Sequence, residues 1–213
     1  MIHILIVERF TLVRSALGSL LAAEPGFSVI AEAGRGDEAL ALARARSPHV
    51  VVLDLLAPGL AGVESMGRFA RVAPQTRIVA LAAPASGPLP RSAMEAGASG
   101  YLTRACRAED LIAAVHAAAR GARFLDPSVA QGLALDELGA PRAPVDRLSP
   151  RELSVMQLVS QGHDRHTISD RLCLSPKTVS TYRTRLMRKL GASSDVELTH
   201  LSLRHGLIEP ALG

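Results

Sequence analysis

The sequence LCLSPKTVSTYRTRLMRKL, residues 172–190, predicts a tight turn followed by one helix with two different faces. Ser175 is a favourable N-cap residue, and Pro176 suits the first helical position, where a missing N–H costs nothing. Hydroxyl and basic groups dominate one face and could hydrogen-bond base edges or neutralise phosphates, although a solvated surface helix would carry similar charges. Apolar residues recur every three or four positions and predict an inward stripe of Val179, Tyr182, Leu186 and Leu190.

The segment before this helix predicts a brace for it. In LSPRELSVMQLVSQG, residues 148–162, Ser149 is followed three residues later by Glu152, which is the pattern of a capping box. Gly162 suits the left-handed residue after a helix end. A short second helix is expected at Arg165–Cys173 and leads into the amphipathic helix. The short helix and the amphipathic helix together predict a helix-turn-helix. The amphipathic helix is the one expected to enter the major groove of DNA.

A fourth helix is expected at Ser193–Arg204. Its apolar surface exceeds what so small a bundle needs, so we expect it to contact a second copy of the chain, with extra core as the alternative. The residues that form this surface are Val196, Leu198, Leu201 and Leu203.

Four short motifs carry a family resemblance in this part of the chain. They are LSPRE at 148–152, TIS at 167–169, LSPKTV at 174–179 and KL at 189–190. Together they resemble the LuxR-type helix-turn-helix. The run TISDRLCLSPKTVSTYRTR, residues 167–185, is especially similar to the GacA/UvrY-type global regulators of the NarL/FixJ class.

The resemblance implies that the outer face of the amphipathic helix contacts double-stranded DNA. We therefore expect a homodimeric transcription regulator that binds a palindromic site. The side chains implied to face base edges are Ser180, Thr181 and Thr184. Those implied to lie near the phosphate backbone are Lys177, Thr178, Arg183, Arg185 and Arg188.

Length and composition restrict the class of protein. At 213 residues with 48% hydrophobic residues, the chain is long enough for two domains. No apolar run approaches the ~20 residues of a membrane span, and the start, MIHILIVERF, lacks the basic region of a signal peptide. Cys106 and Cys173 fall in different expected domains, so we expect a reduced, cytoplasmic protein without a disulfide framework. The net charge of +4 and the pI near 9.7 suit a nucleic-acid partner without proving one.

The N-terminal part predicts a doubly wound α/β domain, in which five strands of a parallel sheet alternate with five helices. In such sheets, ligands bind at the carboxyl ends of the strands. The expected strands are Ile2–Val7, Phe27–Ala33, Val50–Leu53, Arg77–Leu81 and Ser99–Thr103. The expected helices are Leu12–Ala23, Asp37–Ala45, Val63–Val72, Ser92–Ala96 and Ala108–Ala119.

Several residues at these strand ends resemble the receiver domain of two-component response regulators. Asp54 ends the third strand, Pro58 and Gly59 follow it, and Gly97–Ala98 precedes the GYLT run at Gly100–Thr103. The resemblance implies that Asp54 occupies the phospho-acceptor position. It also implies that Tyr101 is the aromatic residue whose rotamer responds to the state of the site.

The remaining signature positions depart from that family. The family has two adjacent acids after the first strand, and this chain has Glu8 and Arg9. It has Thr or Ser after the fourth strand and Lys after the fifth, and this chain has Ala82 and Arg104. Because Mg²⁺ requires hard oxygen ligands, replacing an acid by Arg9 removes a ligand and adds a cation.

We expect Arg9 to pair with Asp54. Two opposite charges ~4 Å apart attract by roughly 4 kcal/mol at an effective dielectric near 20, so the pair would oppose both metal entry and attack on phosphorus. Pro84–Pro90, which holds three prolines, would stiffen the loop that should move. The receiver pocket is therefore expected to be degenerate, to bind Mg²⁺ weakly and to be phosphorylated weakly or not at all, and no cofactor is expected.

Two other readings stay open at this point. Glu8 and Asp54 could hold Mg²⁺ with Arg104 in place of Lys, which would give a conventional regulator switched by a sensor kinase through Asp54. Alternatively, the receiver-like domain could titrate a kinase or another regulatory partner, with DNA binding vestigial. An enzyme is not expected, because the sequence shows no Ser–His–Asp set, Gly-rich phosphate loop or metal-ligand cluster.

The domain organisation expected from these patterns has three parts. Residues 1–120 form the receiver-like domain, and residues 148–213 form the helix-turn-helix domain. Residues 121–147 mix Gly, Pro, Ala and acids, which is typical of an extended, mobile linker. A short helix is expected within this linker at Val129–Leu138.

Overall fold

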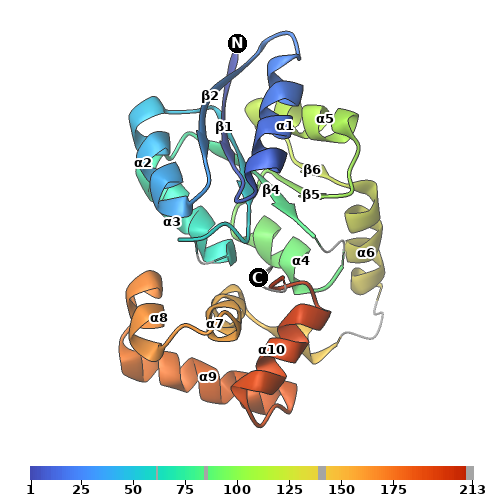
Figure 1. Ribbon diagram of the computed structural model, residues 1–213. Coiled ribbons are helices and arrows are strands. Elements are labelled where there is room, and N and C mark those ends of the chain that lie inside the picture. Colours follow the sequence, from blue (N-terminus) through green and yellow to red (C-terminus); the bar gives the residue numbers. More distant parts are fainter. Residues whose placement is uncertain (61, 84–85, 139–142, 210–213) are drawn as a thin grey trace.

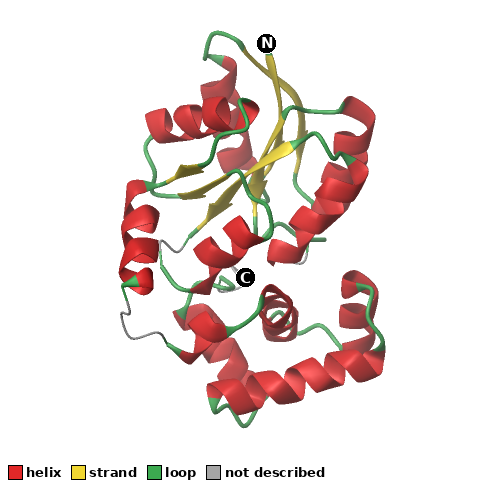
Figure 2. Ribbon diagram, turned by 180° about the vertical axis from the view of Figure 1, so that it is seen from behind, coloured by secondary structure: helices red, strands yellow, loops and turns green. Residues whose placement is uncertain are grey.

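The computed structural model describes residues 1–60, 62–83, 86–138 and 143–209. Its N-terminal part is a parallel sheet with helices on both faces (Figures 1 and 2). The strands are β1 Ile2–Val7, β2 Phe27–Ala33, β3 Val50–Asp54, β4 Arg77–Ala82, β5 Gly100–Thr103 and β6 Phe124–Leu125, and their order in the sheet is β2-β1-β3-β4-β5-β6. The helices of this part are α1 Thr11–Ala22, α2 Gly36–Arg46, the 3-10 turn η1 Gly62–Glu64, α3 Ser65–Val72, α4 Pro88–Glu95, α5 Ala108–Ala119 and α6 Pro127–Glu137.

Alternate residues of the strands supply two apolar cores, one on each face of the sheet. On one face, α1 and α5 pack on β1 and β3 through side chains that include Leu21, Leu111 and Val115. On the other face, α2, α3 and α4 cover the sheet, and this second core continues without a break into the C-terminal part. The two parts of the molecule therefore share apolar surface.

The C-terminal part contains four helices after a short 3-10 turn, as expected for a helix-turn-helix domain. The elements are η2 Pro144–Arg147, α7 Pro150–Ser160, α8 Arg165–Leu172, α9 Pro176–Leu190 and α10 Asp195–Arg204. Helix α7 lies in the middle, where it contacts α9 and α10 on one side and η1 of the receiver part on the other. Figure 1 shows α9 on the side of this domain that faces away from the sheet.

The end of the chain turns back toward the sheet. After α10, Leu207 and Ile208 are buried, and the described chain ends at Glu209, which pairs with Arg9 and Arg104 of the receiver part. The C-terminal segment, residues 207–209, therefore lies between the two parts of the molecule.

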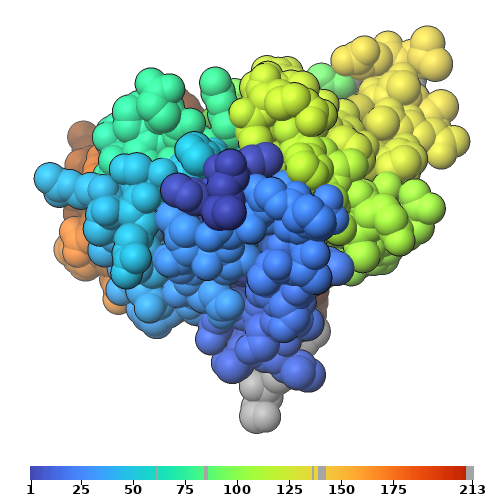
Figure 3. Space-filling model, turned by 90° about the horizontal axis from the view of Figure 1, so that it is seen from above, coloured from blue at the N-terminus to red at the C-terminus, as the bar shows by residue number. Residues whose placement is uncertain are grey.

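The segment expected to be an extended linker is partly folded. β6 pairs with β5, so the sheet has six strands and not the expected five. Helix α6 occupies Pro127–Glu137, close to the short helix expected at Val129–Leu138, and forms the protruding yellow corner in Figure 3. The extended character predicted for this segment is therefore wrong over β6, because two residues are enough to extend a sheet edge by backbone hydrogen bonds, whereas the helix expected in this segment is present as α6.

The starts of helices α4 and α10 are among those that differ from expectation. Helix α4 begins at Pro88 and not at Ser92, because prolines are tolerated in the first helical turn. The expected stiff proline loop is thus partly helix, and Pro84 lies outside the described residues. Helix α10 begins at Asp195 after Ser194, whose side chain accepts the N–H of Glu197 as an N-cap.

Candidate functional site

Helix α9 has the local structure that its sequence predicts. The Ser175 hydroxyl accepts the N–H of Thr178, Pro176 begins the helix, and Gly191 ends it in the left-handed conformation at φ 64°. Val179 and Leu186 are buried, and Tyr182 and Leu190 are half-buried, so the expected inward stripe is confirmed.

The basic residues of α9 divide into two groups. Lys177, Arg185 and Arg188 are exposed and form no ion pair with any described residue. Arg183 instead pairs with Asp195 at 2.8 Å, and Lys189 pairs with Glu152 at 2.8 Å. The first group is free to neutralise phosphates, whereas Arg183 is already engaged within the domain.

The Ser and Thr hydroxyl groups of α9 are each held by a hydrogen bond. Ser180 Oγ donates to the Pro176 carbonyl at 3.1 Å, and Thr184 Oγ1 donates to the Ser180 carbonyl at 3.1 Å. Thr181 Oγ1 donates to the Lys177 carbonyl at 3.0 Å. Because a hydroxyl has two further lone pairs, each of these oxygens can still accept a hydrogen bond from the amino group of adenine or cytosine. Thr178, by contrast, shares its hydroxyl with Ser175 at 2.8 Å.

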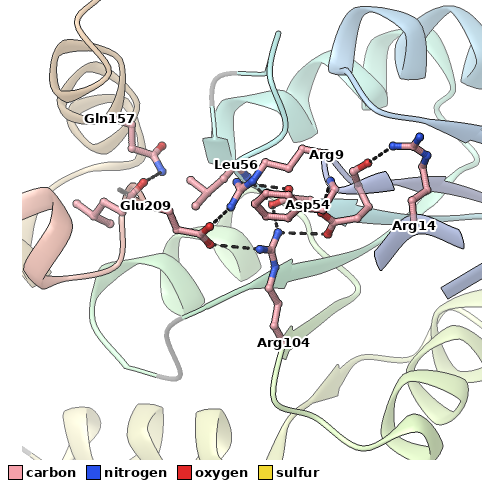
Figure 4. A network of polar contacts seen from close by, with 10 residues as sticks. Arg9, Arg14, Asp54, Leu56, Arg104, Gln157 and Glu209 are labelled. Carbon is pink, nitrogen blue, oxygen red and sulfur yellow. Dashed lines mark hydrogen bonds and ion pairs between the residues drawn. The ribbon is translucent and has the colours of Figure 1, made fainter. Parts of the chain in front are cut away.

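A second candidate site lies at the carboxyl ends of β1, β3 and β5 (Figure 4). Glu8 and Asp54 are both fully buried there, and Arg104 Nη2 lies 3.2 Å from Glu8 Oε2 and 2.8 Å from Asp54 Oδ1. Arg9 Nη1 lies 3.5 Å from Asp54 Oδ2, so the expected Arg9–Asp54 pair is confirmed. The shorter contact is made by Arg104, which the sequence reasoning had placed only at the lysine position.

Two guanidinium groups thus balance two buried carboxylates. Burial raises the pKa of Asp54, and Arg104 and Arg9 act in the opposite direction. Burial likewise raises the pKa of Glu8, against the backbone N–H of Phe10, which donates to Glu8 Oε1 at 2.9 Å. The Phe10 ring also lies 4.7 Å below the Arg9 guanidinium carbon. The arginines therefore favour the charged form of the pocket carboxylates, against the effect of burial.

The other expected pocket residues are buried around this cluster. Ala82 is 1% exposed and brings no hydroxyl group to the pocket. Tyr101 is fully buried, and burial raises its pKa. The Tyr101 ring therefore lies within the apolar core next to β4 and not on the surface.

One member of the cluster has no counterpart in the sequence prediction. Glu209, from the C-terminal segment, accepts hydrogen bonds from Arg9 Nη2 and from Arg104 Nη1, the latter at 3.2 Å (Figure 4). Glu209 is 200 residues from Arg9 along the chain. No local pattern distinguishes it from the other acidic residues, so the sequence offers no signal for this contact.

Mg²⁺, the ion that the receiver resemblance implies, does not fit the residues present. It demands near-octahedral coordination by oxygen atoms. Glu8 Oε2 and both Asp54 oxygens already face guanidinium nitrogens, and Asp54 Oδ1 also accepts the Leu56 N–H at 2.9 Å. Among the described residues, no group of three or more His, Cys, Asp or Glu side chains is placed to hold a metal ion.

The fold and these two sites define a regulator built from a receiver domain and a helix-turn-helix domain. Residues 4–116 match the response regulator receiver domain family, and residues 146–202 match the bacterial regulatory proteins of the luxR family. The chain therefore belongs to the LuxR-type response regulators. No helix in the described part of the chain is long and apolar enough to cross a membrane.

Full-length relatives support the same family. Response regulator GacA of Pseudomonas aeruginosa is 38% identical over 213 residues, covering 99% of this chain and 100% of the relative. Response regulator UvrY of Escherichia coli O157:H7 is 37% identical over 209 residues, covering 97% and 96%. These relatives are named as response regulators and not as enzymes, in agreement with the expectation from sequence.

Solved structures show the same fold. RcsB from Salmonella enterica serovar Typhimurium, bound to promoter rprA in the presence of the phosphomimetic BeF3-, aligns with a TM-score of 0.75 at 21% identity, covering 93% of this chain and 96% of that chain. Response regulator ChrA of a heme-sensing two-component system aligns with a TM-score of 0.54 at 28% identity, covering 97% and 98%.

Proposed function

We propose that the protein is a dimeric, sequence-specific transcription regulator that binds an inverted repeat and acts largely without phosphorylation of Asp54. The observation that carries independence from phosphorylation is the pair of ionic contacts of Asp54, with Arg104 at 2.8 Å and with Arg9 at 3.5 Å. The proposed DNA binding rests on α9, whose outward face carries free basic groups and oriented hydroxyl groups. RcsB, which shares the fold, has been solved on promoter DNA, and this supports a role in DNA binding.

Each part of the α9 surface has its own task in this proposal. Lys177, Arg185 and Arg188 neutralise phosphates, which gives an affinity that falls as salt rises. Ser180, Thr181 and Thr184 accept hydrogen bonds from base amino groups in the major groove and set the sequence preference. Thr178 and Arg183 lie at the edges of this surface, and their engagement within the domain gives them a smaller part.

Dimerisation is assigned to α10. Val196 is 63% exposed and Leu203 is 36% exposed on this helix. Two copies joined there would present two α9 helices to half-sites spaced near one helical turn. The assembly we propose is therefore a homodimer in the cytoplasm, on a palindromic DNA site, with a sensor kinase or another regulatory protein as a further partner.

Phosphorylation independence follows from the charges of the pocket. Phosphoryl transfer depends on positioned cations and on a free attacking carboxylate. Here both Asp54 oxygens face guanidinium groups, and Ala82 has no hydroxyl to bind a transferred phosphoryl group. We divide the chain for this function into a receiver at 1–120, a connecting segment at 121–147 and a DNA-binding domain at 148–213.

The test is selection of binding sites from a pool of random duplexes by the full-length, unphosphorylated protein. We expect enrichment of a palindromic sequence without any phosphodonor. Enrichment only after addition of acetyl phosphate and Mg²⁺ would keep the DNA function and establish the conventional, phosphorylation-switched regulator instead. No enrichment under either condition would favour a protein that titrates a partner.

A further inference from the structure

We propose that Arg9 and Arg104 form a carboxylate-binding site whose occupant is Glu209 of the same chain, and that this contact holds the DNA-binding domain against the receiver. The chemistry of this site differs from that of the receiver family described above. Where related receivers bind a metal ion among acids, this pocket presents the outer nitrogens of two arginines.

The geometry of the two guanidinium groups leaves a place for one more anion. Arg104 uses Nη2 for Glu8 and Asp54, and its Nη1 points to Glu209 at 3.2 Å. Arg9 uses Nη1 for Asp54 and Nη2 for Glu209. The pocket carboxylates therefore take the inner nitrogens, and Glu209 takes the outer ones (Figure 4). Because a guanidinium has five donors in a rigid fork, it can serve both sides at once.

Burial gives this contact its strength. The Arg9 and Arg104 side chains are only 14% and 24% exposed. Charged groups removed from water are costly unless they are paired and hydrogen-bonded, so an unpaired outer nitrogen on either arginine would be unfavourable. Glu209, 31% exposed at its side chain, is the described residue that meets this need from the other domain.

The residues before Glu209 deliver its carboxylate to the pocket. Leu207 is fully buried, Ile208 is 7% exposed, and the Leu207 carbonyl accepts a hydrogen bond from Gln157 Nε2 at 2.9 Å. Gln157 belongs to α7, so the C-terminal segment is anchored on the DNA-binding domain at one end and on the receiver at the other. The same Gln157 packs on Gly62 of η1, where an added Cβ would clash with Gln157 Oε1.

The contact acts on the domain arrangement and not on the DNA surface, because α9 faces away from the receiver (Figure 1). A polar companion of this contact across the interface is the Arg151–Glu64 ion pair at 2.9 Å. Any anion that competes for Arg9 and Arg104 would weaken the hold on Glu209. The state of the receiver pocket is thereby coupled to the separation of the two domains.

The test uses a thiol placed in the interface. Leu158 of α7 is 1% exposed and lines a small cavity together with Leu60 and Gly62 of the receiver part. In the full chain carrying Leu158→Cys, Cys106→Ser and Cys173→Ser, the labelling rate of the thiol reports how often the domains separate. We expect Glu209→Gln to speed labelling about tenfold, with an unchanged circular dichroism spectrum, since tenfold corresponds to about 1.4 kcal/mol.

Two matched variants make the result decisive. Glu109→Gln removes an exposed carboxylate of α5 outside the pocket and should leave the labelling rate unchanged. Arg151→Gln removes the companion ion pair and should speed labelling, which shows that the assay detects opening. If Arg151→Gln speeds labelling and folded Glu209→Gln does not, the proposal is wrong. If Glu209→Gln fails to fold, Glu209→Asp, which shortens the reach by one methylene, must speed labelling for the proposal to stand.

Discussion

Arg104 Nη2 lies 2.8 Å from Asp54 Oδ1 and 3.2 Å from Glu8 Oε2, so one side chain from the end of β5 binds the carboxylates at the ends of β3 and β1. An internal cation therefore lies between the two carboxylates. Both carboxylates are fully buried, and their negative charges are balanced within the chain.

Restoring the family residues should create a metal site. We expect a variant with Arg9→Asp, Ala82→Thr and Arg104→Lys to bind Mg²⁺, because it exchanges two guanidinium groups for a third carboxylate and a single ammonium. The wild-type protein should show no binding isotherm under the same conditions in titration calorimetry. Equal Mg²⁺ affinity of the two proteins would refute the assignment of the arginines as the resident cations.

Thr181→Ala should relax sequence preference. Thr181 Oγ1 donates to the Lys177 carbonyl and keeps lone pairs for a base amino group, so its loss removes one base contact. We expect discrimination at one base pair of each half-site to fall about fivefold, which corresponds to about 1 kcal/mol. Competition binding with cognate and single-substituted duplexes measures this. If Thr181→Ala loses the same factor of affinity on the cognate and on a random duplex, Thr181 does not read a base.

Arg188→Ala should instead weaken binding to all DNA sequences alike. Arg188 is exposed and forms no ion pair with a described residue, so its charge is available to a phosphate. The slope of log affinity against log salt should fall in magnitude by about 1 per protomer. A selective loss on the cognate site, with an unchanged salt slope, would be the contrary result.

Glu152 should make the stability of the DNA-binding domain depend on pH. Burial opposes ionisation of Glu152, but the hydrogen bonds from Lys189 and Ser149 prevail and lower its pKa from 4.5. A carboxyl group whose pKa is lowered by folding stabilises the protein above its unfolded pKa, and this contribution disappears as pH falls through the folded pKa. We expect Glu152→Gln to cost about 1–2 kcal/mol near neutrality.

The measurement is denaturant unfolding of wild type and Glu152→Gln across the acidic range. The difference between the two free energies of unfolding should be constant near neutral pH and should shrink below the ordinary carboxyl pKa. A difference that grows on acidification would show that Glu152 is not stabilised as an ion. Glu109→Gln, at an exposed position of α5, provides the comparison.

Local patterns predicted most of the elements. The strands β1 and β2 and helix α5 have the expected bounds, because runs of branched residues and regular apolar spacing determine them. The capping box of Ser149 and Glu152 and the N-cap of α9 were also predicted, since capping depends on residues three positions apart. The same reasoning missed β6, whose two residues carry no periodicity.

Long-range contacts were predicted only where family positions gave a reason. The Arg9–Asp54 pair could be expected because the receiver family brings these two positions together in one pocket and because their charges attract. The contact of Glu209 with Arg9 and Arg104 could not, because it depends on how the second domain packs on the first. That packing depends on the apolar surface that α7 presents to the receiver part. Local sequence patterns predict α7 itself, but they do not specify what this surface packs against.

The most direct measurement is the affinity of the full-length protein for its selected palindromic site, with and without acetyl phosphate and Mg²⁺. If Arg104 and Arg9 keep Asp54 from acting as a phospho-acceptor, the dissociation constant should be the same under both conditions. Intact-protein mass spectrometry of the same samples should show no phosphorylated species. Tighter binding after the phosphodonor, with a phosphorylated species that Asp54→Asn abolishes, would contradict phosphorylation independence.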